Sequence, residues 1–246
     1  MSVNQNMANR EVCDLTLCDY KTKVPKLVCD YANTTTTDKT GEVAYAYGGQ
    51  GYSPRISFSG KNGGTLKVET QIQPFQLYSI MSGAAIEATA NFIKKETKTT
   101  TTESPTITLE GTPATGSPCN VFAVGKLDTV VPATLSGTTV TLTTPTPGSY
   151  DVYYVESITT NVKKLSIKNT TFPKAFTIYA ETINKTEDDE VLPYKMVYYK
   201  AVPQPNFTIT NSSQGDPTTL SLTFDLFSNG SGDMLDMILI EDDQNA

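Results

Sequence analysis

The sequence predicts an all-β protein with an antiparallel β-sandwich or barrel-like core, one short helix and long loops. The strand formers Thr, Val, Tyr, Ile and Phe are abundant in the 246 residues, whereas the helix formers Leu, Ala and Glu are comparatively sparse. In residues 191–225, apolar side chains also recur at every second position. This is the period of a strand with one buried face.

Two short strands are expected near the N-terminus, followed by a long excursion. Residues 12–18 alternate in polarity, and residues 24–29 form a second short apolar run. Residues 30–52 then contain four consecutive threonines, a Val-Ala-Tyr-Ala-Tyr run and, within residues 48–51, three glycines. A Tyr- and Gly-bearing excursion of this length predicts either a long hairpin or a loop that binds partners.

A tight hairpin is expected next. The pair Asn62-Gly63 lies between two short runs with strand character, residues 55–58 and 65–70. Because Asn-Gly is the strongest short-range signal for a hairpin turn, we predict that these two runs pair around it.

The period then changes, which indicates the one helix. Phe75, Tyr78 and Met81 recur at every third position, with Pro74 before them and Gly83 just past the end. Proline at the start and glycine after the end are typical of a short helix. Residues 84–95 return to alternation, so a strand is expected there.

The middle of the chain differs from the rest in its spacing of strand-like runs. Residues 94–104 are a low-complexity polar stretch that suggests a boundary. Residues 105–168 contain five short strand-like runs separated by Gly and Pro. They form either a small inserted β module, with residues 1–104 and 169–246 as the core, or strands that belong to the main sheets.

The C-terminal third predicts a bent meander. Val202-Pro203-Gln204-Pro205 ends the strand over residues 195–202, because two prolines so close together cannot continue a ladder. Alternation over residues 207–209 and 220–226 predicts two further strands, joined by a Gly-Asp-Pro reversal. Residues 234–240 are expected to form a last strand or a short helix.

Charge and chemistry exclude several classes of function. A net charge of −7 and a pI of about 4.7 argue against a protein that grips nucleic acid through its phosphates. No apolar run approaches the roughly 18 residues of a membrane span. The chain has no histidine, so the usual general base and the commonest metal ligand are missing.

We therefore expect no enzyme, no cofactor and no metal site. The four cysteines, three clustered and one distant, lack the paired spacing of a zinc site and are expected to be free thiols. Two carboxylates that meet across a sheet could serve a glycosidase, but a chain without Trp is less suited to bind a sugar.

Two motifs suggest a family. The helix with its terminal glycine, residues 77–84, and the Gly-Asp-Pro turn with the alternating strand after it, residues 206–227, resemble those of the tail tube proteins (major tail subunits) of long-tailed bacteriophages. The resemblance covers about two thirds of the chain, and residues 105–168 look like a decoration. Phage capsid decoration or cement proteins, and other β-rich surface binding modules, use similar Thr-rich strands and are the alternative.

The resemblance implies a virion protein of the phage tail, made in the cytoplasm of the host bacterium. Hexameric rings of the protein would stack into a tube that conducts the genome into the host. The partners would be other copies of the chain, with the tail sheath, the baseplate and the tape-measure protein as further candidates. DNA would pass through without specific binding, and no membrane would be involved. An acidic lumen would suit this role because it repels phosphate.

The same reading assigns candidate residues to two surfaces. Residues 30–52 would reach the adjacent ring, with Tyr45, Tyr47 and Tyr52 as the contacts. The lumen would be lined by polar residues of two alternating strands, namely Glu69, Glu87, Thr89 and Asn91. On the second of these strands Ile86, Ala88, Ala90 and Phe92 would pack inward. The alternative is that both strands face solvent on the outer wall.

Overall fold

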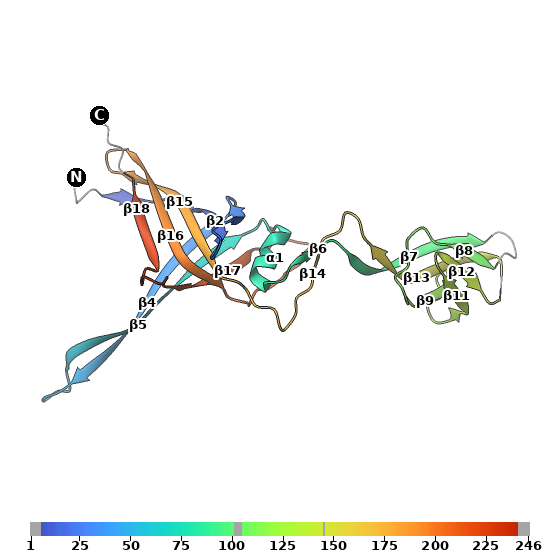
Figure 1. The fold of residues 1–246 in the computed structure, drawn as a ribbon, viewed down its shortest axis with the longest axis horizontal. Helices are drawn as coiled ribbons and strands as arrows, with labels where there is room; N and C mark the ends of the chain where they lie inside the picture. The colour runs from blue at the N-terminus through green and yellow to red at the C-terminus, as the bar shows by residue number, and fades with distance from the viewer. Residues whose placement is uncertain (1–5, 101–104, 145, 241–246) are drawn as a thin grey trace. The chain divides into compact units, whose positions relative to one another are not determined.

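The computed structural model describes residues 6–100, 105–144 and 146–240 and contains two compact units (Figure 1). Unit 1 consists of Met1–Ala84 and Ile167–Ala246, and unit 2 of Ala85–Ser166. The described residues are mostly strands, paired antiparallel, with one short helix. The predicted all-β class is therefore confirmed.

Unit 1 is built on one nine-stranded sheet. Its main path runs in the order β3-β2-β15-β16-β17-β5-β4, while β1 pairs with β15 and β18 with β16. The strands are β1 (Met7–Ala8), β2 (Asp14–Asp19), β3 (Pro25–Cys29), β4 (Thr34–Tyr47), β5 (Pro54–Thr70), β15 (Phe176–Thr186), β16 (Val191–Pro203), β17 (Leu220–Phe227) and β18 (Leu235–Leu239).

This sheet folds over on itself. The Cys13 amide, just before β2, donates to Thr35 Oγ1 on β4 at 3.2 Å. The hydroxyls of Thr37 on β4 and Tyr198 on β16 lie 2.6 Å apart. Because β2 and β4 stand near opposite ends of the strand order, these bonds require the two ends of the sheet to face each other. The core is thus barrel-like, as expected.

The core of unit 1 lies inside this fold. On β17 every second side chain is buried, namely Leu220, Leu222, Phe224 and Leu226, as the alternation predicts. They pack in one cluster with buried side chains of β2, β5, β15 and β16. Excluding that much apolar surface from water is the main source of the unit's stability.

The predicted helix is confirmed as α1 (Phe75–Ser82), which adds Leu77, Ile80 and Met81 to the same cluster. Gly83 ends it with φ 70°, a left-handed conformation that suits glycine. A Cβ at this position would also overlap the Phe172 carbonyl. The last predicted element, over residues 234–240, is a strand, β18.

The expected hairpin at Asn62-Gly63 is wrong. The stretch Pro54–Thr70 is one continuous strand, β5, and it pairs along its length with β4. The glycines of this region allow a close approach of the two strands instead of a turn: a Cβ at Gly64 would lie 2.9 Å from the Asp38 carbonyl oxygen. Of the two readings of residues 30–52, the long hairpin is the one that forms, and its turn falls between Tyr47 and Pro54.

The strand expected over residues 207–209 is also wrong. The chain has no strand between Pro203 and Leu220, although Phe207 packs against the core. Pro205 and Pro217 lack an amide donor, and the Ser212 hydroxyl donates to the nearby Gln214 carbonyl at 2.8 Å. Such local bonds compete with a ladder.

Unit 2 is a small two-sheet module with its own core. Sheets β10-β9-β13-β7 and β11-β12-β8 enclose a separate apolar cluster that includes Val121, Val140 and Val152. A two-stranded ladder joins β6 and β14. The strands are β6 (Ile86–Glu87), β7 (Ala90–Thr100), β8 (Thr106–Thr108), β9 (Cys119–Ala123), β10 (Val130–Val131), β11 (Ala133–Ser136), β12 (Thr139–Leu142), β13 (Gly148–Ile158) and β14 (Lys164–Leu165).

The module begins earlier than the boundary expected at residue 104. Strand β7 pairs with β13 from Ala90 to Thr100, so it belongs to unit 2 and not to the core sheet. The polar composition of residues 94–100 marks a strand of this module rather than a linker. Residues 101–104, the rest of the expected boundary segment, lie outside the described residues.

We predict that unit 1 folds without unit 2, because their apolar clusters share no residue. Replacing Ala85–Ser166 with a short Gly/Ser bridge should leave a cooperative thermal transition and the β-type circular dichroism of a packed protein. A molten remainder that binds a hydrophobic dye would show that the strands of unit 2 complete the main fold.

Candidate assembly surfaces

The most exposed apolar surface of unit 1 is a two-stranded ribbon, residues 41–62, which we call the arm (Figure 1). Strand β17 pairs with β5 from Thr70 only as far as Gly64. Beyond that point β5 continues with β4 as its one neighbour among the described residues. An isolated two-stranded hairpin is marginally stable in water, and the arm has no third strand among the described residues to stabilise it as the rest of the sheet does.

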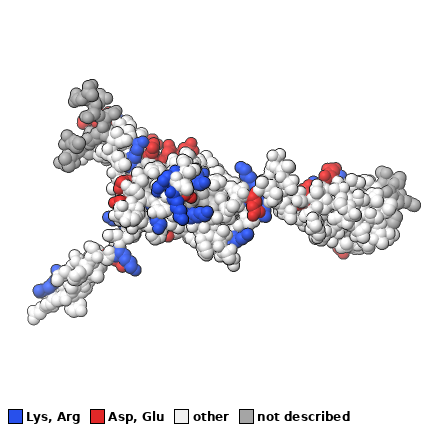
Figure 2. Space-filling model, viewed as in Figure 1, with Lys and Arg blue, Asp and Glu red and all other residues white. Residues whose placement is uncertain are grey.

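Large apolar side chains are exposed along the arm. Tyr52 is 78% exposed, and the others are 49–58% exposed, namely Val43, Tyr45, Tyr47, Ile56 and Phe58. Figure 2 shows the arm as mostly uncharged surface with a few charged side chains. Phe58 pairs with Ala44 and Ile56 with Ala46, so these two side chains lie on one face of the ribbon, and Val43, Tyr45 and Tyr47 lie on the other. Exposed apolar surface of this kind is typical of a site of protein–protein contact.

The tip of the arm is held in one conformation by its own contacts. The rings of Tyr47 and Tyr52 stack with centroids 5.5 Å apart, and Tyr45 lies 6.4 Å from Tyr47. Arg55 Nε donates to the Gly48 carbonyl at 2.8 Å. The structure thus brings the three tyrosines of the predicted contact loop together on one ribbon; their contact role remains a prediction.

A second candidate surface is the free edge of β18. Strand β16 pairs with β18 over Tyr194–Tyr198 and with β17 over Lys200–Pro203, so these two strands follow one another along the same side of β16. In the described chain no strand pairs with the other edge of β18. Such an edge presents unpaired backbone groups to another strand.

A groove runs beside this edge. Its lining includes the apolar side chains of Leu226, Met234, Leu235 and Met237, and it is closed on the far side by residues of β4 and β5. Met237 is 66% exposed. The sequence signal for this surface was weak, because residues 234–240 fitted a strand or a helix equally well.

The candidate lumen residues are not brought together. Glu69 lies on β5 of unit 1, where Lys67 Nζ is 2.6 Å from its Oε1. Glu87 lies on β6 of unit 2 and pairs with Lys164 at 2.7 Å. Thr89 and Asn91 also lie in unit 2 and are exposed. The two strands proposed to share a lumen therefore belong to different sheets.

The expected inward packing of Phe92 is wrong. Its side chain is 68% exposed, and the next residue, Ile93, is 60% exposed. At this end β7 has only β13 as a partner in the described chain, and that pairing leaves both faces open to solvent. The sequence alternates in polarity here, but no second layer of the described residues covers the apolar face of the strand.

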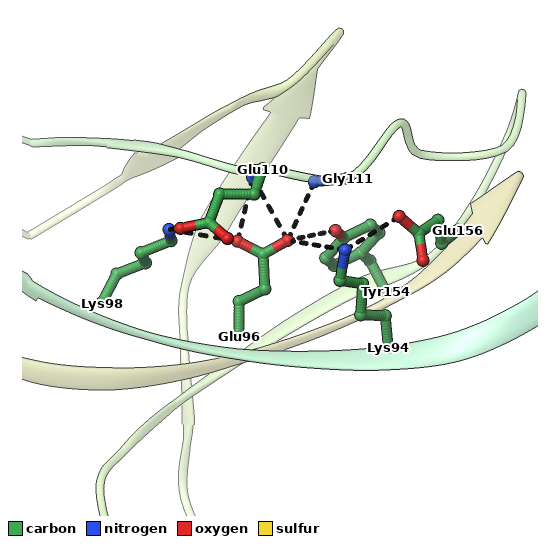
Figure 3. A network of polar contacts seen from close by, with 7 residues as sticks. All are labelled: Lys94, Glu96, Lys98, Glu110, Gly111, Tyr154 and Glu156. Atoms are coloured by element: carbon green, nitrogen blue, oxygen red, sulfur yellow. Dashed lines mark hydrogen bonds and ion pairs between the residues drawn. The ribbon is translucent and has the colours of Figure 1, made fainter. Parts of the chain in front are cut away.

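Sequence reasoning missed a buried polar network in unit 2. Figure 3 shows its members, which are Lys94, Glu96, Lys98, Glu110, Gly111, Tyr154 and Glu156. The Glu96 carboxylate is its centre, with a side chain only 6% exposed. It accepts hydrogen bonds from the amides of Glu110 at 2.9 Å and Gly111 at 3.0 Å, and from the Tyr154 hydroxyl.

The network fixes the loop after β8 onto the sheet. Lys98 Nζ lies 3.3 Å from Glu96, and Lys94 Nζ bridges Glu96 at 3.6 Å and Glu156 at 2.8 Å. Gly111 permits the close packing, because a Cβ there would overlap Tyr154 and Glu156. A lone acidic residue in a polar strand gives no sign of this role in the sequence.

The hydrogen bonds outweigh the cost of burying the charge. Burial by itself would raise the pKa of Glu96, but bonds from the Tyr154 hydroxyl, the two loop amides and Lys98 lower that pKa to about 2. Burial and the adjacent carboxylate raise the pKa of Tyr154. Glu96 is thus ionised, and Tyr154 is its proton donor, throughout the neutral range.

The exposed apolar ribbon and the free sheet edges are surfaces of the kind that proteins often cover with another chain. A model of the YomU/Tube protein family matches residues 10–237. The chain belongs to this family of phage tail tube proteins and is therefore a virion component. The resemblance seen in the sequence is confirmed. No curated protein matches the chain.

Two further observations concern the described residues. None of their helices has both the length and the apolar character that crossing a membrane requires. Within the same residues, no three side chains of His, Cys, Asp or Glu gather closely enough to hold a metal ion. The four cysteines have free thiols, and burial raises the pKa of Cys13, Cys29 and Cys119.

We predict that Glu96→Gln destabilises unit 2 by about 1–3 kcal/mol, since it leaves buried donors and an amide poorly paired. In the wild type the folded pKa of Glu96 lies below its unfolded value. Its contribution is therefore complete above about pH 4.3 and is lost as the pH falls toward 2.

Hydrogen exchange of the whole chain, followed at residues 105–118, measures this effect. The matched control is Glu110→Gln, whose carboxylate is 79% exposed and pairs with Lys98. That surface pair should contribute less than about 1 kcal/mol. Equal protection losses in the two variants would contradict the assigned role of Glu96.

Proposed function

We propose that this tail tube protein forms hexameric rings that stack into a tube, and that the tube conducts the phage genome into the host. The role is structural rather than catalytic. The observation that carries the proposal is the arm, a ribbon of exposed tyrosines and apolar side chains that the described part of the chain leaves uncovered. A family member with such a surface needs a neighbouring subunit to bury it.

Lateral contacts would use the free edges of the sheet. The edge of β18 and the groove beside it can accept a strand from a neighbour, which extends the ladder across the subunit boundary. Within the described residues, β3 at one end of the strand order offers a second free edge, although Pro25 and Lys26 make its first residues a poor template. Edge pairing repeated around a closed ring leaves no free edge.

The arm would contact an adjacent ring. Its tyrosines are rigid, amphipathic side chains that lose little conformational entropy when they are buried, as suits a contact that forms late in assembly. The tail sheath, the baseplate and the tape-measure protein are the further partners that we propose. A net charge of −7 is consistent with a lumen along which DNA slides without binding.

Removing the arm should abolish tube formation without unfolding the subunit. Because Gly41 pairs with Asn62, residues 42–61 can be replaced by Asn-Gly, which closes the shortened hairpin. Circular dichroism and thermal unfolding should be unchanged, while negative-stain microscopy shows no tubes.

A triple substitution tests whether the arm acts through its tyrosine side chains rather than through its backbone. Tyr45→Ser, Tyr47→Ser and Tyr52→Ser should likewise prevent tubes. The matched control, Phe92→Ser with Leu127→Ser, changes side chains of similar exposure in unit 2 and should assemble as the wild type does. Normal tubes from the tyrosine variant would overturn the proposed role of the arm, and monomers that decorate a shell would favour a capsid protein.

The lumen assignment is tested by charge reversal, one unit at a time. If Glu69 lines the channel, Glu69→Lys should permit tubes but slow DNA release from virions, most strongly at low salt, where attraction to phosphate is least screened. Glu87→Lys asks the same question of unit 2. Release at the wild-type rate at low ionic strength would place the altered residue outside the channel.

A further inference from the structure

Basic residues gather at one end of the β15–β16 hairpin. The cluster, which we call the basic end, consists of Lys21, Lys23, Lys26, Lys174 and Lys200. Lys21 and Lys23 lie in the turn between β2 and β3, and Lys26 is the second residue of β3. Lys174 leads into β15, whose first residue, Phe176, pairs with Ala201 next to Lys200. Figure 2 shows basic side chains gathered in one patch on unit 1.

Specific contacts hold this end in shape. Lys23 Nζ lies 4.9 Å and Lys200 Nζ 5.6 Å from the centroid of the Tyr20 ring, so both lysines make cation–π contacts with the same ring. Lys23 Nζ also donates to Thr177 Oγ1 at 2.6 Å. Asp19 is the acidic residue of the turn, and its Oδ1 accepts the amide of Lys21 at 3.0 Å. Five lysines against this one carboxylate leave four net positive charges.

Acidic residues occupy the opposite end of the same hairpin. The turn that joins β15 to β16 contains Glu187, Asp188, Asp189 and Glu190, all exposed. Lys185 offsets one of them, with Nζ 2.6 Å from Asp189. Glu187, Asp188 and Asp189 against this one lysine leave two net negative charges at what we call the acidic end.

The two ends are too far apart to neutralise each other within one subunit. Strand β15 is 11 residues long. At about 3.3 Å per residue it separates the two ends by roughly 35 Å. This is several times the screening length of about 8 Å at physiological salt. Each subunit therefore has an excess of lysines at one end of this hairpin and an excess of carboxylates at the other.

We propose that the basic end of one copy docks on the acidic end of the next, so that the charges set the head-to-tail polarity of the stack. This inference rests on the stacked rings of the proposed function and names the surfaces that meet. Opposite charges attract only when copies stack in the same direction, whereas like ends repel. Complementary charge of this kind speeds association and fixes orientation, and the apolar arms add buried area.

Charge reversal at each end, followed by mixing, tests this docking. The first variant is Lys21→Glu with Lys26→Glu and Lys174→Glu, which makes both ends acidic. The second is Glu187→Lys with Asp188→Lys, which makes the acidic end basic. All five side chains are exposed, so both variants should fold. The matched control, Lys126→Glu with Lys163→Glu and Lys168→Glu, changes the net charge as the first variant does, but at exposed lysines outside the basic end.

Each variant alone should form rings that do not stack, as seen by negative-stain microscopy and by sedimentation. An equimolar mixture should restore tubes, in which rings of the two variants alternate. A chain carrying both reversals should also stack, because its polarity is merely exchanged. The control should form tubes as the wild type does, and wild-type stacking should weaken as salt is raised from about 50 to 500 mM.

Three results would overturn the proposal: tubes of normal length from either variant alone, no rescue on mixing, or stacking by the wild type that is insensitive to salt. Loss of retardation of a linear DNA duplex in the first variant, with stacking intact, would assign the basic end to nucleic acid instead. If the wild type and the control form no rings at all, the proposed function fails, and that outcome is distinct from failure of the docking.

Discussion

The structure depends on the burial of one apolar face of a sheet that folds over on itself. Leu66 of β5, Tyr198 of β16 and Phe224 of β17 are each at most 2% exposed and belong to a single cluster. The bond between the Tyr198 and Thr37 hydroxyls then pairs a polar atom that the fold has buried. The parts of the strands that extend beyond this closed cluster have no second layer to pack against among the described residues. They form the arm and the free edges of the sheet.

The candidate assembly surfaces lie where this closure stops. Beyond Gly64, β5 loses β17 as a neighbour, and the side chains that follow lie on a ribbon without a second layer. Hydration of exposed apolar side chains such as Tyr45 and Phe58 costs free energy in a monomer. In the proposed contact between copies, burying the same side chains would be stabilising. Unit 2 differs, since its two sheets enclose their own cluster and its polar centre, Glu96, is fully paired.

The charge distribution would add direction to the proposed contacts. Apolar surface is nearly indifferent to orientation, whereas opposite charges at the two ends of one hairpin are not. The overall charge of −7 conceals this, because composition counts the lysines around Tyr20 and the acids at 187–190 as if they cancelled. Only the antiparallel pairing of β15 with β16 and β2 places the two groups at opposite ends.

The sequence by itself determined the all-β class, the helix that ends at Gly83, the buried face of β17 and the family, because each rests on local periodicity or on a contiguous motif. Tertiary structure decided which strands pair. Asn62-Gly63 has the chemistry of a turn, yet β4 extends beside it, and the pairing of β5 with β4 from Glu69 to Pro54 outweighs one local preference. The same reason explains why the lysine cluster, the groove beside β18 and the Glu96 network could not be predicted. Each is made by residues far apart in the chain, and only the ladder brings them together.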